Sequence, residues 1–338
     1  MNNMNKNLVL IGATLALSLT LVGCNKSGKL DETSTFKTPT GPVELKLKFP
    51  KGERIVQDMD LIQTSALTIP GQPAPTEQGT TMGMQYALTV LQATPDAGHE
   101  VEMEFLSARM KTTTAGRTVL DYDSTKKPTP GKRNPLDNIY GKIVGSKIRF
   151  FLNATNGVER VEGVDEMMTR LQAGATPADL APLKSLYTEG YFKQMMQANQ
   201  YMPSKPVQPG DTWPIQIEVP VGMMGNLQLN YDFTFKSWEM HGKRNCARLE
   251  FSGTITSTPN TNASPTGMTI NILGGDSSGT SWFDPEIGKT IDTTMNQDIN
   301  MTIGLPASQL GMRGAPGQIQ TISNQVTQVQ TIKLSSVK

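Results

Sequence analysis

The sequence predicts a mainly β protein with a helical insertion: a long-stranded, curved antiparallel sheet forming a half-barrel or open barrel. Apolar and polar residues alternate over most of the chain, which is typical of strands with one buried face. The 31 Gly and 22 Pro exclude a helical bundle or coiled coil, which does not tolerate so many helix breakers. Several alternating segments run for about 10 to 15 residues, beyond the usual five or six, and strands of that length twist and curl.

Charge and composition exclude several classes of function. Lys plus Arg number 31 and Asp plus Glu number 30, so no net positive field recruits nucleic acid. The two His residues are too few for a His-based metal cluster, and the two Cys residues are too few for a disulfide framework. We therefore expect no nucleic-acid partner, no metal and no cofactor.

Residues 1–23 are predicted to be a signal peptide. Lys6 supplies a positive start, and residues 8–22 form an uncharged apolar run that is short for a membrane span of about 20 residues. The run ends in Leu21-Val22-Gly23-Cys24, which resembles the lipobox of bacterial lipoproteins. That resemblance implies cleavage before Cys24, a covalent lipid on its sulfur and anchoring in the cell envelope. Asn25 in place of Asp favours the outer membrane if the host has two membranes.

Residues 24–42 are predicted to be a lipid-anchored flexible tether, because they are polar and rich in Ser, Thr, Lys and Gly. Residues 43–202 follow as a first β half. Its alternating segments are expected as strands at 43–49, 55–61, 82–90, 101–105, 147–152 and 158–161. Asn156-Gly157 is the strongest short hairpin signal between two of them.

Two helices are predicted at the end of this half. Residues 164–174 carry apolar residues at helical spacing and end at Gly174. Residues 177–202 begin after Thr176 as N-cap, with Pro177 in the first turn, and their apolar stripe includes Leu183, Tyr187, Tyr191, Met195 and Met202. The apolar arc is broader than a helix covering a sheet requires. We expect these five residues to line a ligand site.

Residues 203–338 are predicted to be a second β half. Alternation resumes over 213–219, 227–235, 247–255 and 268–272, and a hairpin is expected around residues 283–289. A very long strand over 291–303 and a Gln/Thr-rich strand over 318–334 complete the chain. Both halves run from long hairpins to a short Gly-containing hairpin, which suggests two similar halves, although no residue-level repeat is evident.

Several turn-rich motifs resemble an uncharacterised bacterial lipoprotein family of unknown function. They are Leu120-Asp121-Tyr122-Asp123-Ser124, Ile143-Val144-Gly145, residues 156–163 (NGVERVEG), Pro209-Gly210-Asp211-Thr212-Trp213 and residues 283–288 (FDPEIG). The resemblance implies no site residues. In architecture alone, the predicted curved sheet is also similar to lipid-carrying half-barrels of the bacterial envelope, where a sheet wraps helices around an apolar cavity.

Two motifs point to chemistry that their contexts do not favour. Residues 275–279 match the G-x-S-x-G pattern around Ser277, but both His residues precede Ser277 and a hairpin, not a helix, follows it. Residues 121–125 begin like a calcium loop, but Lys126 and Lys132 occupy the sixth and twelfth positions.

Other residue groups are better explained by structure than by chemistry. Glu100, Glu102 and Glu104 fit a solvated sheet face, and Cys246 fits an inert thiol. The 19 Met residues fit core filling or an adaptable apolar surface better than a copper site. Lys126, Lys127, Lys132 and Arg133 fit a solvated basic loop.

The sequence thus favours a lipid-anchored envelope protein without enzymatic activity, which binds or carries an apolar or amphiphilic ligand. A structural or protein-interaction lipoprotein is the alternative, and a serine hydrolase using Ser277 is a remote one. An apolar cavity would favour the first hypothesis, and a solid core with an exposed apolar patch the second.

Overall fold

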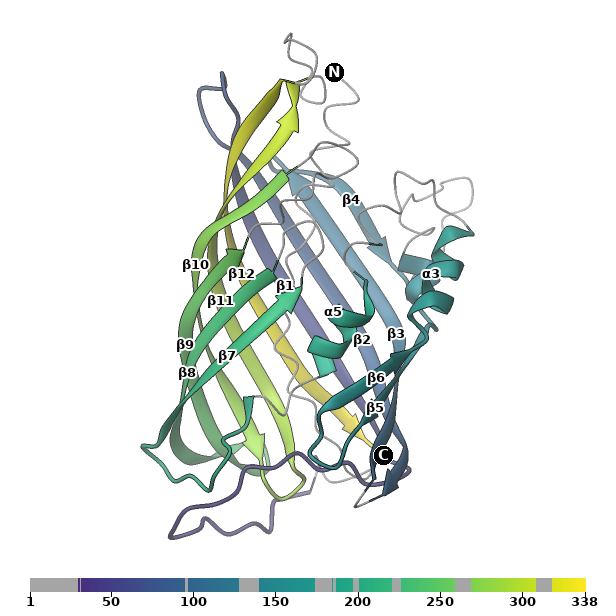
Figure 1. Ribbon diagram of the computed structural model, residues 1–338, viewed down its shortest axis with the longest axis vertical. Coiled ribbons are helices and arrows are strands. Elements are labelled where there is room, and N and C mark those ends of the chain that lie inside the picture. The colour runs from purple at the N-terminus through teal and green to yellow at the C-terminus, as the bar shows by residue number, and fades with distance from the viewer. Residues whose placement is uncertain are drawn as a thin grey trace.

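The computed structural model describes residues 30, 32–94, 97–127, 140–173, 184, 187–196, 201–220, 226–258, 269–307 and 318–338 (Figure 1). The strands of these residues are β1 Arg54–Thr68, β2 Thr76–Thr94, β3 Gly98–Thr114, β4 Arg117–Asp123, β5 Lys147–Leu152, β6 Val158–Glu162, β7 Thr212–Pro220, β8 Asn226–His241, β9 Arg244–Thr258, β10 Thr269–Asp284, β11 Lys289–Pro306 and β12 Ile319–Val337. The helices are α2 Tyr140–Ile143, α3 Val164–Gln172 and α5 Glu189–Met196.

All twelve strands belong to one antiparallel sheet, ordered β6-β5-β3-β2-β1-β12-β11-β10-β9-β8-β7 with β4 paired to β3. The carboxy-terminal strand β12 pairs with β1 on one side and β11 on the other, so strands from both ends of the chain meet at the centre of the sheet. The sheet is curved and does not close, as predicted (Figure 1). Its two edges, β6 and β7, are both in contact with α5.

The predicted strand length is confirmed, since β2 and β12 each run for 19 residues. Their burial alternates along almost the whole length, which places alternate side chains on the concave face. Two glycines on that face are covered by aromatic rings of the next strand: Phe251 packs over Gly279, and Tyr231 packs over Gly253. The rings fill the space that a side chain would otherwise occupy.

The predicted first strand, 43–49, is wrong as a strand. Leu45, Leu47 and Phe49 are buried, as the alternation indicates, but the segment pairs with no neighbouring strand beyond a single bridge between Val43 and Val207. It crosses one end of the sheet instead (Figure 1). Period-2 burial requires only extended backbone with one covered face, so alternation alone does not predict sheet pairing. Conversely, strand β4 and the short helix α2 were not predicted, because neither carries a clear period.

The single helix predicted over 177–202 is also wrong. Tyr187 and Thr188 are not helical, and α5 begins at Glu189, where the Thr188 hydroxyl accepts a 3.1 Å hydrogen bond from the Tyr191 backbone N–H. This side-chain cap starts a new helix where the apolar spacing predicted continuation. The helix predicted over 164–174 agrees with α3, and Gly163 precedes α3 in a left-handed conformation.

A buried ionic cluster joins the amino-terminal segment to one end of the sheet. The Arg244 guanidinium pairs with Asp284 at 2.6 Å and with Glu286 at 2.7 Å, and Glu286 also accepts hydrogen bonds from the Ser34 and Thr35 hydroxyls. Desolvation opposes ionisation of Glu286, but these hydroxyls and Arg244 together hold its pKa at about 2. Ser34 and Thr35, which were expected to belong to a flexible tether, are therefore held against the sheet.

A second buried pair lies at the same end. Lys289 is fully buried, donates a 2.7 Å hydrogen bond to the Lys48 carbonyl and lies 3.8 Å from the Glu53 carboxylate. Burial raises the pKa of Glu53 to about 7, against the opposing charge of Lys289. These contacts connect the segment before β1 to the β10–β11 hairpin.

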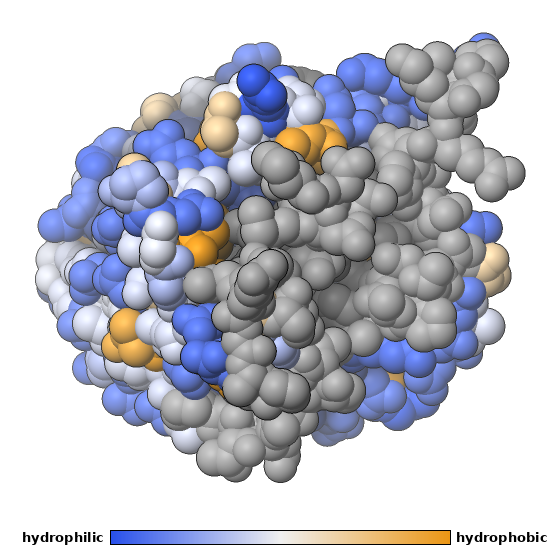
Figure 2. All heavy atoms as spheres, turned by 90° about the horizontal axis from the view of Figure 1, so that it is seen from above, coloured by the Kyte–Doolittle hydropathy of each residue, from blue (hydrophilic) through white to orange (hydrophobic). Residues whose placement is uncertain are grey.

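The outer face of the sheet is polar and carries cross-strand ion pairs, among them Lys147–Glu102, Arg54–Glu104 and Lys236–Glu250. Glu102 is itself largely buried, so the predicted solvated face is at this position a packed row of ion pairs. Seen from one end, the coloured surface is mostly hydrophilic with isolated hydrophobic residues (Figure 2). No helix of the described residues is long and apolar enough to span a bilayer.

Candidate functional site on the concave face

A row of polar side chains crosses the concave face of the sheet. The row takes one position from each of eight neighbouring strands, in the sheet order β3-β2-β1-β12-β11-β10-β9-β8, and each position is directly paired with the next. Every side chain in the row is at most 4% exposed. In sheet order the positions are Thr112, Thr80, Gln63, Gln328, Gln297, Ser277, Gly253 and Tyr231. We call these residues the polar row.

Hydrogen bonds connect parts of the polar row. The Gln328 amide donates to the Gln297 carbonyl oxygen, and the Gln63 amide donates to the Ser65 hydroxyl at 3.2 Å. The Tyr231 ring reaches across Gly253. Burial raises the pKa of Tyr231, and the nearby Ser277 and Gln297 side chains partly offset this rise. The row is therefore a neutral chain of amides and hydroxyls inside the sheet.

An apolar row runs beside the polar row, again through direct cross-strand pairs. It consists of Met110, Met82, Leu61, Met295, Phe251, Phe233 and Trp213. Gln330 interrupts it between Leu61 and Met295, and Gly279 stands between Met295 and Phe251. The concave face is thus banded, with hydrogen-bonding groups alongside sulfur-containing, aliphatic and aromatic surface.

Several buried polar atoms on this face have no hydrogen-bond partner among the described residues. Gln330 lacks partners at both its amide nitrogen and its carbonyl oxygen, although it is only 2% exposed. The same holds for the side-chain oxygens of Gln57, Tyr86, Thr112 and Asn324. Gln57 and Tyr86 are direct cross-strand partners. Because an unpaired buried polar group costs about 1–3 kcal/mol, so many in one region point to binding rather than packing.

The predicted ligand-lining residues cluster with other tyrosines against this face. Tyr187, Tyr191 and Met195 of the α5 region are half-buried and pack against the core, and Met202 is buried. Leu183 lies outside the described residues. The fully buried side of α5 is instead formed by Phe192 and Met196, one residue along from the predicted stripe.

The tyrosine rings are close to one another. Tyr187 and Tyr191 pack edge to face with ring centres 6.1 Å apart, and Tyr140 lies 5.8 Å from Tyr122. Burial raises the pKa of Tyr140 to about 12, and burial together with neighbouring Tyr191 and Asp58 raises that of Tyr86. These hydroxyls therefore stay protonated and act as neutral donors.

The geometry at Ser277 does not match a hydrolase nucleophile. Ser277 lies in the middle of β10, whereas the G-x-S-x-G elbow requires a sharp turn from strand to helix. Its cross-strand neighbours are Gly253 and Gln297, while His99 is the second residue of β3 and His241 ends β8. The serine instead belongs to the polar row.

The other candidate residues from the sequence either have structural roles or lie outside the described residues. Asp123 accepts hydrogen bonds from the Thr125 backbone and hydroxyl, which makes a turn after β4. Among the described residues, no group of three or more metal-ligating side chains is found. Burial raises the pKa of the Cys246 thiol to about 12. Cys24, Met223, Met224, Lys132 and Arg133 lie outside the described residues.

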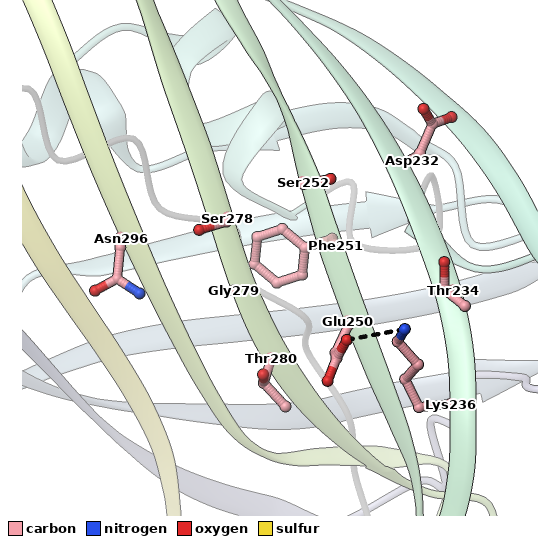
Figure 3. Close-up of a pocket in the computed structure, with 10 residues that line it drawn as sticks. All are labelled: Asp232, Thr234, Lys236, Glu250, Phe251, Ser252, Ser278, Gly279, Thr280 and Asn296. Atoms are coloured by element: carbon pink, nitrogen blue, oxygen red, sulfur yellow. Dashed lines mark ion pairs between the residues drawn. The ribbon is translucent and has the colours of Figure 1, made fainter.

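The outer face also has a shallow polar depression of about 390 Å³ (Figure 3). Its side chains come from β8, β9, β10 and β11 and include Asp232, Thr234, Ser252 and Asn296, together with the 3.2 Å Lys236–Glu250 pair. Phe251 and Gly279 also line it, and the Phe251 ring packs over Gly279. The charged groups of this depression face solvent, whereas the polar row of the concave face is buried and neutral.

The polar row was not predicted. Its members are far apart in the chain, and each alone is an ordinary Gln, Thr or Ser in an alternating strand. One signal was present: in β12 the inward positions include Asn324, Gln328 and Gln330 among Ile and Val. Polar residues in phase with a buried face are the pattern that identifies such a site.

Comparison with known proteins assigns a family but no activity. No curated protein matches the chain. Solved structures with some similarity include OccK5 from Pseudomonas aeruginosa (7% identity, 83% of this chain and 98% of that chain covered, TM-score 0.23). An outer membrane channel from Pseudomonas putida has 9% identity, covers 88% of this chain and 100% of its own, and gives a TM-score of 0.24. A DUF1329 family protein from Desulfovibrio piger has 7% identity over 82% of this chain and 85% of its own, with a TM-score of 0.13. Such TM-scores support no functional argument. The model of the family of unknown function DUF6263 matches residues 96–289, more than half of the chain, and the protein belongs to that family.

Proposed function

We propose that this protein is a lipid-anchored lipoprotein of the cell envelope that binds an amphiphilic ligand on its concave face and acts as a carrier, without catalysing a reaction. The observation that carries the proposal is the banding of that face. Unpaired polar atoms of Gln330, Gln57 and Asn324 lie among buried apolar side chains. An amphiphile supplies the hydrogen-bonding partners that these polar atoms lack, and its apolar chain packs against the surrounding apolar side chains.

The open edge of the sheet supports the same function. Strands β6 and β7 share no hydrogen bonds with each other, and α5 contacts both. A ligand that enters the concave face does not need to break the sheet if α5 shifts. The half-buried Tyr187 and Tyr191 then lie next to the ligand, where their hydroxyls orient its polar end.

Binding is tested with the mature Cys24→Ala chain, which keeps the segment docked through Ser34 and Thr35. We expect native mass spectrometry to detect a bound long-chain lipid and a fluorescent acyl probe to give saturable binding. Tyr191→Ala should weaken binding about fivefold, because about 1 kcal/mol of contact is lost. Val329→Ala, on the exposed outer face, is the control. Absence of both bound lipid and saturable titration contradicts the carrier function and favours the structural or protein-interaction alternative.

Anchoring has a separate test at Cys24. Cys24→Ala should release the protein from membranes into the soluble fraction, because two or three acyl chains make attachment effectively permanent and the variant lacks them. Its thermal unfolding should be unchanged. Fractionation and incorporation of labelled fatty acid measure this. Labelled fatty acid that is still incorporated into the variant shows that Cys24 is not the lipid site.

A further inference from the structure

The concave face carries information about the polar end of the ligand, because the hydrogen-bonding side chains of the polar row are all neutral. Apart from Gly253, every member of the polar row carries an amide or a hydroxyl, and Gln330, Gln57 and Asn324 add further amides. The buried charges Arg244, Asp284, Lys289 and Glu53 are engaged in ion pairs at one end of the sheet. No cation belongs to either row.

This neutrality determines what a buried headgroup costs. A carboxylate or phosphate moved out of water without a cation partner loses several kcal/mol of solvation, which hydrogen bonds from neutral amides recover only in part. A hydroxyl, ester or amide loses far less, and a hydroxyl or amide has both a donor and an acceptor to match those of Gln330.

Gln330 is the residue most directly available to such a headgroup. Its donor and its acceptor both lack partners among the described residues, and its cross-strand neighbours Leu61 and Met295 offer only apolar contact. A group that both donates and accepts, such as a glycerol hydroxyl or an amide, satisfies both atoms at once. Leu61 and Met295 then contact the adjacent acyl chain.

We infer that the concave face selects a neutral amphiphile whose headgroup both donates and accepts hydrogen bonds, such as an acylglycerol, over an anionic lipid of the same chain length. The inference rests on the proposed function and deepens it. It also implies that Gln330 serves binding rather than folding, since its amide has no hydrogen-bond partner among the described residues.

Three ligands with one acyl chain separate the contributions: monolauroylglycerol, methyl laurate and laurate at pH 8. With the mature Cys24→Ala chain, calorimetry should give the tightest binding for monolauroylglycerol, weaker binding for methyl laurate and the weakest for laurate. Gln330→Met keeps the side-chain length and removes both polar atoms. It should weaken monolauroylglycerol binding about tenfold, the equivalent of one hydrogen bond, and weaken methyl laurate binding less, because an ester accepts a hydrogen bond but donates none.

The ligand-free variant supplies an independent readout. Gln330→Met should raise the thermal midpoint, because an unpaired buried amide is replaced by apolar surface. Gln325→Met, on the exposed side of the same strand, is the matched control, and Asn324→Leu is a second inward variant with the same expectation. A lower midpoint in both inward variants shows that the amides are structural and overturns the inference.

The outcomes for the two proposals differ. Saturable binding in which laurate equals or exceeds monolauroylglycerol overturns the selection of a neutral headgroup but leaves the carrier function standing. The absence of saturable binding by all three ligands contradicts the carrier function, and the inference fails with it.

Discussion

Arg244→Met is expected to lower the free energy of unfolding by about 3–5 kcal/mol, because it leaves buried carboxylates without their cation. Arg244 is 4% exposed at its side chain, and Asp284 is fully buried. Methionine approximates the aliphatic part of arginine, so most of the loss is electrostatic rather than a cavity. Chemical denaturation at pH 7 measures the change.

The same substitution should release the amino-terminal segment. Glu286 loses the cation that helps to orient it toward Ser34 and Thr35, so proteolysis within residues 32–42 should become faster. Arg248→Met is the matched control, because Arg248 pairs with Glu239 and Glu250 on the outer face, where about 1 kcal/mol or less is expected. A similarly small loss of unfolding free energy for both variants contradicts a stabilising role of the buried ionic cluster.

The buried ionic cluster shows which structural features the sequence predicted and which it did not. A hairpin was predicted around residues 283–289, and it is confirmed between β10 and β11. Its role as the attachment point of residues 32–49 was not predicted, because Glu286 and Ser34 are 252 positions apart. Local turn chemistry is visible in a sequence, but the partner of a charged turn residue depends on the assembled fold.

The same distinction applies to the sheet. Alternation predicted nearly every strand, because which side chains are buried follows from a period of two. It did not predict which strands are neighbours, and the pairing of β1 with β12 is what brings Gln63 beside Gln328. The candidate site depends on that register, so its polar row became recognisable only in three dimensions.

The prediction of one helix over residues 177–202 was wrong for a different reason. The apolar stripe from Leu183 to Met202 is compatible with a continuous helix, but Thr188 caps a new helix within it. The apolar side chains at positions 187, 191, 192, 195 and 196 also form an arc too broad to indicate which of them is most buried. Phe192 holds that place at 1% exposed, while the predicted Tyr191 is half-buried. The structure thereby separates the buried Phe192 from the half-buried Tyr187 and Tyr191, which we propose to face the ligand.

Phe192→Ala is accordingly expected to cost about 3–5 kcal/mol, because a fully buried ring is removed from contacts with Phe105, Tyr187 and Tyr191. The loss should appear first at the open side of the sheet. Hydrogen exchange should accelerate in α5, β6 and β7, which share contacts with the helix, while β1 and β12 stay protected at the centre. Lys193→Ala, the next residue of α5, should change neither stability nor exchange by a measurable amount. If Phe192→Ala costs less than about 1 kcal/mol with exchange unchanged, α5 is not held by this ring, and the helix is not the element that admits a ligand.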